Sequence, residues 1–141
     1  EGVTEVLDKA FYNCSGITGL SLPKNITTIG HSAFCYCTEL TGTLTIKSEI
    51  EKIGTKAFAE CHKLTKISYI SPATTSIKTI NDNAFENCYG LNSITIPTNV
   101  YSLGSGRTFY NCSGATGTLI LPKNLKKYLH MLFTIVVRLK Y

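Results

Sequence analysis

Short runs in which apolar and polar residues alternate recur along most of the chain. Alternation at every second position predicts short strands with one buried face. The apolar members of these runs are Leu20 and Leu22, Leu44 and Ile46, Ile67 and Tyr69, Ile94 and Ile96, and Leu119 and Leu121. A second apolar pair follows four of the runs: Ile26 with Ile29, Ile50 with Ile53, Ile77 with Ile80, and Val100 with Leu103. The pattern therefore predicts two short strands in each unit.

An Ala-Phe or Thr-Phe pair recurs with the runs, and a cysteine follows each Phe three residues later. The pairs are Phe11 with Cys14, Phe34 with Cys37, Phe58 with Cys61, Phe85 with Cys88, and Phe109 with Cys112. Gly30, Gly54 and Gly104 stand shortly before three of these pairs. Glycine is favoured where φ is positive, so we expect the chain to turn there into one short helical turn.

A unit of this length cannot bury its own apolar side chains. Stacking successive units builds one continuous core, so residues 1–125 are predicted to form a solenoid of about five coils. Each Phe and each Cys should then lie above its equivalent in the preceding coil. Extra residues at 71–76 predict a surface loop, and Lys47 stands where Pro ends three other runs.

The unit Ala-Phe-x-x-Cys-x-x-Leu-x-x-Ile-x-Ile-Pro-x-x-Ile-x-x-Ile-Gly resembles the BspA-like leucine-rich repeat. This family occurs in surface proteins of bacteria and of some protist parasites. The resemblance covers roughly residues 6–125 and implies an α/β-type leucine-rich-repeat solenoid, dominated by β-structure. It also implies an extracellular or cell-surface location and a role in binding or adhesion.

Residues 126–141 depart from the repeat and carry Lys126, Lys127, Arg138 and Lys140 without an acidic residue. We expect this segment to be a divergent C-terminal cap, because the last coil of a solenoid needs cover. Two alternatives are a membrane-surface or partner-binding segment and an unnatural end. The rest of the chain is nearly neutral, which argues against nucleic acid as a partner, and no apolar run is long enough for a transmembrane helix.

The remaining candidate chemistry is sparse. Five of the six cysteines occupy one repeat position and are expected as buried thiols, whereas Cys35 lies outside this column and is expected to be semi-exposed. A zinc or redox site using Cys35, Cys37 and His31 or His62 is a weak alternative, since zinc needs four converging ligands. No spacing indicates a catalytic group or a phosphate-binding loop, so we expect neither enzymatic activity nor a cofactor.

Two sets of surface residues are candidates for partner binding. The first consists of tyrosines near the Phe-Cys corner: Tyr12, Tyr36, Tyr89 and Tyr110. The second is a row of short side chains on the solvent face of the strands: Ser21, Thr45, Ser68 and Thr95. Tyrosine is enriched at binding hot spots, although the same rings could simply cover apolar surface between coils.

These observations together predict a non-enzymatic recognition or adhesion module, secreted or at a cell surface. Its expected partner is a protein or a glycan, for example a component of a host matrix or cell surface. The alternative is a structural spacer, a stiff segment within a longer array of repeats.

Overall fold

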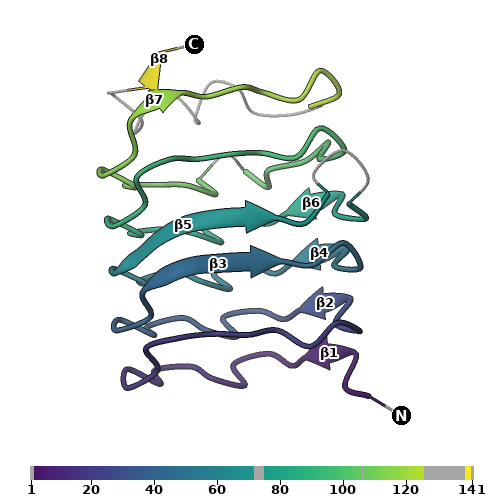
Figure 1. The fold of residues 1–141 in the computed structure, drawn as a ribbon, viewed down its shortest axis with the longest axis vertical. Coiled ribbons are helices and arrows are strands. Elements are labelled where there is room, and N and C mark those ends of the chain that lie inside the picture. The colour runs from purple at the N-terminus through teal and green to yellow at the C-terminus, as the bar shows by residue number, and fades with distance from the viewer. Residues whose placement is uncertain (1, 72–74, 106, 126–138, 141) are drawn as a thin grey trace.

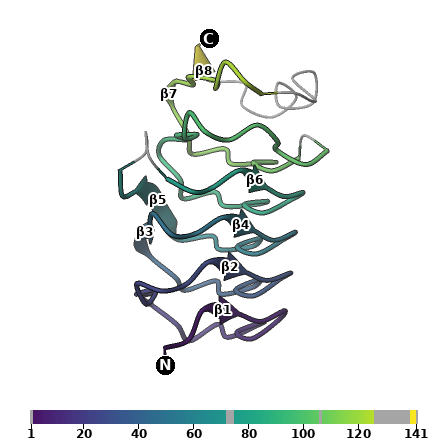
Figure 2. The same cartoon turned by 90° about the vertical axis from the view of Figure 1, so that its right-hand side faces the viewer.

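A computed structural model describes residues 2–71, 75–105, 107–125 and 139–140. The chain winds into coils that stack along one axis, with the N-terminus at one end and the C-terminus at the other (Figure 1). The view turned by 90° shows that equivalent corners of successive coils lie above one another (Figure 2). The predicted leucine-rich-repeat solenoid is thereby confirmed.

One parallel sheet runs along the stack and is built from the second apolar pair of each unit. Its strands are β1 (Glu5–Val6), β2 (Thr28–Ile29), β4 (Lys52–Ile53) and β6 (Thr79–Ile80), in the order β1-β2-β4-β6. The apolar residues that lie opposite one another are Val6, Ile29, Ile53 and Ile80. An isolated parallel bridge between Thr79 and Ser102 extends the pairing to the next coil. The sheet therefore holds five coils in one register.

The alternating runs form a second, less regular layer. Strands β3 (Gly42–Ile46) and β5 (Leu64–Tyr69) pair in parallel, with a register shift between Gly42 and Thr43. Near the C-terminal end, β7 (Gly117–Thr118) pairs with β8 (Leu139–Lys140). Thus one part of the predicted cap lies beside the fifth coil, while residues 126–138 and 141 are outside the described residues. Residues 72–74 of the predicted loop are outside them too.

Each predicted helical turn takes the form of consecutive hydrogen-bonded turns, and the described residues contain no helix. In the first corner, Ala10 N–H donates to Leu7 O, and Cys14 N–H donates to Phe11 O. The third residue of each turn is left-handed: Lys9 (φ 57°) in the first and Asn13 (φ 60°) in the second. Equivalent left-handed pairs recur in the next three corners, for example Ser32 and Tyr36, and Asn111 is left-handed in the fifth, so these corners bend in a similar way.

Hydrogen bonds between coils join the corners. The Phe34 N–H donates to Ala57 O at 2.8 Å, and the Phe58 N–H donates to Ala84 O at 2.8 Å. Buried backbone groups need such partners, and here the next coil supplies them. The corner is consequently a rigid surface and not a loose loop.

The glycines before the corner do not all serve the predicted purpose. Positive φ is confirmed at Gly104 (58°) but is wrong at Gly30 and Gly54. The left-handed conformation falls two residues later, for example at Lys56 (φ 56°). A Cβ atom at Gly54 would lie 2.6 Å from the carbonyl carbon of Gly30 in the preceding coil. Glycine is required there because adjacent coils approach too closely for any side chain.

Candidate functional site

The corner rests on a column of phenylalanine rings inside the solenoid. Rings in adjacent coils are stacked with centroids 5.1 to 5.4 Å apart and interplanar angles of 2° to 6°. Phe34, Phe58, Phe85 and Phe109 are buried, whereas Phe11 at the N-terminal end is 41% exposed. This column fixes the height and orientation of every corner residue above it.

A column of thiols lies beside the rings, as predicted. Cys37, Cys61, Cys88 and Cys112 are buried, and Cys14 is partly buried. Each buried thiol donates to the carbonyl of the phenylalanine one coil earlier; for Cys88 and Phe58 the Sγ–O distance is 3.2 Å. Burial raises the pKa of Cys37 to about 11 and that of Cys112 to about 12. These thiols are therefore protonated hydrogen-bond donors of the core.

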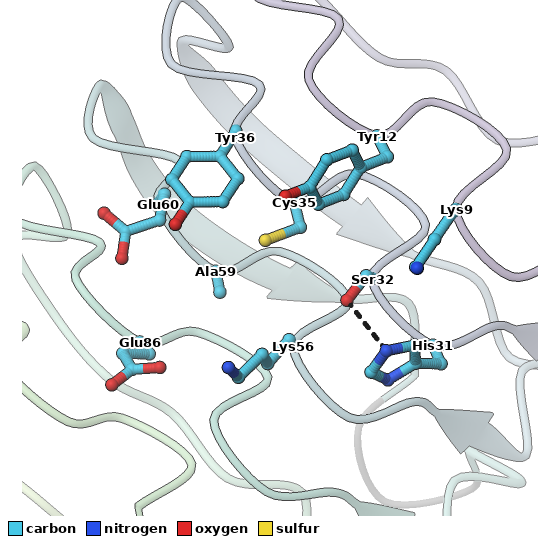
Figure 3. A pocket seen from close by; sticks show the side chains of 10 residues that line it. All are labelled: Lys9, Tyr12, His31, Ser32, Cys35, Tyr36, Lys56, Ala59, Glu60 and Glu86. Atoms are coloured by element: carbon cyan, nitrogen blue, oxygen red, sulfur yellow. Dashed lines mark hydrogen bonds between the residues drawn. The ribbon is translucent and has the colours of Figure 1, made fainter.

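The position after each phenylalanine creates a hollow on the outside of the corner. In order along the chain this position holds Tyr12, Cys35, Ala59, Glu86 and Tyr110. Because two small side chains lie between larger ones, a groove of about 380 Å³ opens over the second and third coils (Figure 3). Cys35 and Ala59 form its floor and are 3% and 2% exposed. The predicted semi-exposure of Cys35 is wrong, because its side chain lies below the groove surface.

Two of the predicted tyrosines form one rim of this groove. Tyr12 is 45% exposed and Tyr36 is 41% exposed. Their rings meet edge to face with centroids 5.7 Å apart, a favourable arrangement for aromatic pairs. The Lys9 ammonium group lies 6.0 Å from the centroid of the Tyr12 ring. The rim thus presents aromatic surface and two hydroxyl groups on a fixed backbone.

Charged residues of both signs border the rest of the groove (Figure 3). Lys9, His31 and Lys56 line one side, and Glu60 and Glu86 lie together at the end toward the later coils. The His31 ring is held by a hydrogen bond of 3.2 Å between its Nε2 and the Ser32 hydroxyl. The groove therefore combines a basic wall with an acidic end.

A polar ladder fixes Glu60 in place. One carboxylate oxygen accepts a hydrogen bond from the Asn87 amide at 2.5 Å, and the other lies 2.9 Å from His62 Nε2. Asn87 in turn accepts a bond of 3.0 Å from the amide of Asn111. These residues of three coils hold one another, so the acidic end of the groove is preorganised.

Opposite charges act on the same thiol at the groove floor. Burial raises the pKa of Cys35, the Glu60 carboxylate raises it further, and Lys56 opposes the rise. The pKa of the exposed Tyr36 hydroxyl is also raised, chiefly by Glu60. Both shifts arise because Glu60 lines the groove together with Cys35 and Tyr36.

The other two predicted tyrosines lie outside the groove. The Tyr89 ring contacts His62, with centroids 5.0 Å apart, and the Arg107 guanidinium lies 5.5 Å from the Tyr110 ring centroid. Both tyrosines are exposed. The four rings therefore do not form one continuous edge, because they occupy three different positions of the repeat.

The predicted strand-face row lies on a different side of the coil. Thr45 in β3 pairs with Ser68 in β5, while Ser21 and Thr95 occupy the equivalent places in the neighbouring coils. Ser21 and Thr95 are exposed, and Thr45 and Ser68 are half-buried. This row carries short side chains, and two of them line hollows: Thr95 lines one of about 320 Å³ beside Ile120, and Ser21 lines one of about 350 Å³ at the N-terminal end.

The structure separates the residues of the alternative metal site. Cys37 donates its thiol hydrogen to Phe11 O in the core, whereas Cys35 faces the groove. Across the described ranges, no three His, Cys, Asp or Glu side chains are grouped so that they could hold a metal ion. In the same residues, no helix has the length and apolar character needed to cross a membrane.

Of the residues that line the groove, the sequence analysis named Tyr12 and Tyr36 as candidates for partner binding but not the charged ones. The missed residues are Lys9, His31, Lys56, Glu60 and Glu86. One signal was available in the sequence. Aligning the repeats shows a small residue directly after the phenylalanine in two successive coils, Cys35 and Ala59, where the other coils carry Tyr or Glu. The sequence does not show which charged side chains surround that gap.

The stacked coils and the phenylalanine and cysteine columns define a leucine-rich-repeat solenoid. The model of the BspA type leucine rich repeat region matches residues 4–140 with six copies, and the chain belongs to this family. The resemblance inferred from the motif is confirmed, with one copy more than the five Phe-Cys pairs indicate. No curated protein matches the chain.

Three solved structures of bacterial proteins are similar to this chain. The leucine rich repeat protein of T. pallidum is 31% identical with a TM-score of 0.76, over 85% of this chain and 53% of that one. A leucine rich cell surface protein of Faecalibacterium prausnitzii is 25% identical with a TM-score of 0.59, over 83% and 36%. A leucine-rich repeat protein of Bacteroides ovatus, 24% identical with a TM-score of 0.62 over 87% and 38%, shares the fold. The chain thus spans about half or less of each relative.

Proposed function

We propose that this chain is a non-enzymatic recognition module that binds a protein or a glycan through the groove at its corner. The observation that carries the proposal is the Tyr12–Tyr36 pair beside a preformed hollow, on a backbone held by hydrogen bonds between coils. Rigid, exposed tyrosines provide contact area at low entropic cost, and they are enriched at binding hot spots.

The proposed location is outside the cell or at its surface. Two findings support it: the chain belongs to the BspA type family, and one similar structure is that of a cell surface protein. The groove also suits recognition better than it suits catalysis. Its only thiol, on Cys35, has a pKa raised by burial, which disfavours a nucleophilic thiolate.

A binding panel tests the proposal. Labelled protein is applied to purified extracellular matrix proteins and to glycans, and the affinity for each bound member is measured. Combined substitution of Tyr12→Ala and Tyr36→Ala should weaken binding by about 30-fold or more, the effect expected of a hot spot. Tyr101→Ala is the matched control, because Tyr101 is an exposed tyrosine outside the groove.

Two outcomes would count against the proposal. Binding that survives the double substitution would exclude the groove rim as the contact surface. Failure of the parent protein to bind any member would instead favour a structural spacer, which needs the stiff stack of coils and no ligand.

A further inference from the structure

The distribution of charge in the groove narrows the class of partner. This step rests on the proposed recognition role and concerns the same site. Lys9 and His31 come from the first and second coils, whereas Glu60 and Glu86 come from the third and fourth. Lys9 and His31 therefore lie toward one end of the groove along the solenoid axis and the two carboxylates toward the other, while Lys56 comes from the third coil, as Glu60 does (Figure 3).

Several of these charges lack a partner within the protein. Among the described residues, neither Lys56 nor Glu86 forms an ion pair, and Glu60 is bonded only to the neutral amide of Asn87 and to His62. Charges left unpaired beside a hollow can be neutralised by a ligand of complementary charge. The groove is thus complementary to a ligand that carries both signs.

This complementarity favours a polypeptide over an acidic glycan. A polyanion would meet Glu60 and Glu86 at one end, and like charges brought together at an interface are costly. A purely basic segment would meet Lys9 and Lys56 in the same way. A polypeptide supplies basic and acidic side chains within one short stretch, and its intervening backbone offers groups to which the Tyr12 and Tyr36 hydroxyls can bond.

The spacing of the coils sets the spacing of the charges. Parallel strands stack about 4.8 Å apart, so groups two coils apart are separated by about 10 Å, and an extended peptide covers this distance in about three residues. We infer that the groove binds an extended polypeptide segment with a basic and an acidic side chain about three residues apart. The acidic side chain lies near Lys9 and His31, and the basic one near Glu60 and Glu86.

Three capped peptides of equal length test this inference, with the cores KSSE, ESSE and KSSK in the same flanking sequence. Titration into ¹⁵N-labelled protein, followed by NMR, gives both the affinity and the location. The KSSE peptide should shift the amide signals of Cys35 and Ala59 and should bind at least about tenfold more tightly than either single-sign peptide.

Two variants and one control variant make the test specific to the groove. Ala59→Tyr should abolish binding by filling the hollow, and the fold should tolerate it because Tyr12 and Tyr110 occupy the same repeat position. Ser113→Tyr is the matched control, since it adds a tyrosine at the exposed repeat position that Tyr89 occupies in another coil. Glu86→Lys should shift the preference from KSSE to ESSE.

The outcomes separate this inference from the proposed function. Equal or tighter binding of ESSE, or of heparin, would show a polyanion site and overturn the inference. Failure of KSSE to bind at millimolar concentration would overturn it as well. If the parent protein still bound a panel member in a manner dependent on Tyr12 and Tyr36, the recognition role would stand while the mixed-charge ligand would be rejected.

Discussion

The Cys61 thiol donates a hydrogen bond to the backbone carbonyl of Phe34 in the preceding coil, with 3.3 Å between Sγ and O. The same contact recurs one coil later between Cys88 and Phe58. Cysteine at this position therefore does two things at once: it fills the interior beside the phenylalanine column, and it donates a hydrogen bond to a carbonyl of the preceding coil, which for Phe34 adds to the bond from the Cys37 N–H. An aliphatic residue could do only the first.

Replacing this thiol in the middle of the column should be costly. Cys61→Ala removes the sulfur from a fully buried site and leaves the Phe34 carbonyl with only the hydrogen bond from the Cys37 N–H, so we expect a loss of about 2 kcal/mol in the free energy of unfolding. Urea denaturation measures this loss in the free energy of unfolding, and the m-value should not change. Cys14→Ala is the control, because Cys14 occupies the same repeat position but is partly exposed. Equal losses at both sites would contradict the assigned role.

The buried thiols should make stability fall at alkaline pH. Burial raises the pKa of Cys37 from 9.0 to about 11, so the folded protein keeps this proton to higher pH than the unfolded chain. The stabilisation is therefore complete below the unfolded pKa and is lost as the pH rises toward 11. Urea midpoints measured between about pH 8 and about pH 11 should decrease. In Cys37→Ala the urea midpoint should decrease less over this pH range. An equal decrease would show that the Cys37 thiol does not cause it.

Removing one buried hydroxyl should stabilise the protein. Tyr69 in β5 is buried, and its hydroxyl has no hydrogen-bond partner among the described residues. An unsatisfied buried polar group costs about 1–3 kcal/mol, so Tyr69→Phe should raise the free energy of unfolding by about 1 kcal/mol. The expected rise in melting temperature is a few degrees. Tyr89→Phe, at an exposed ring, should change little, and a destabilised Tyr69→Phe would indicate that the Tyr69 hydroxyl is in fact satisfied.

The glycine before the corner should be intolerant of any side chain. In Gly54→Ala the new Cβ would meet the backbone of Gly30 at 2.6 Å, which forces two coils apart, and we expect a loss of about 3 kcal/mol. Gly19→Ala is the matched control, since nothing lies within 4 Å of the corresponding Cβ. Thermal unfolding of the two variants checks this. Similar melting temperatures would argue against the close approach of the coils.

Binding should depend on the groove and not on the other candidate surfaces. Once a ligand is found, Tyr36→Ala should weaken its binding by about tenfold or more, whereas Tyr89→Ala and Tyr110→Ala should have little effect. Thr45→Lys tests the strand-face row in the same assay. Fluorescence or calorimetric titration gives the affinities. A larger effect of Thr45→Lys than of Tyr36→Ala would show that the ligand binds the strand-face row and not the groove.

The coil arrangement could be predicted because it depends on periodicity alone. The spacing of Phe34 and Phe58, and of the cysteines that follow them, places equivalent residues above one another once the units stack. The alternation around Leu44 and Ile46 likewise indicates which side chains point inward. The details of the corner could not be predicted in this way, since whether Gly54 is needed for its φ or for its lack of Cβ depends on how near the next coil lies.

The sequence by itself determined the repeat, its register and the residues of the core, because a side chain's inward or outward direction follows from its place in the unit. Only the tertiary structure decided the groove. Its floor depends on the relative size of Cys35, Ala59 and the larger residues stacked around them. Its charge depends on Lys9, His31, Lys56, Glu60 and Glu86 converging from four successive coils, which is a relation between positions far apart in the chain.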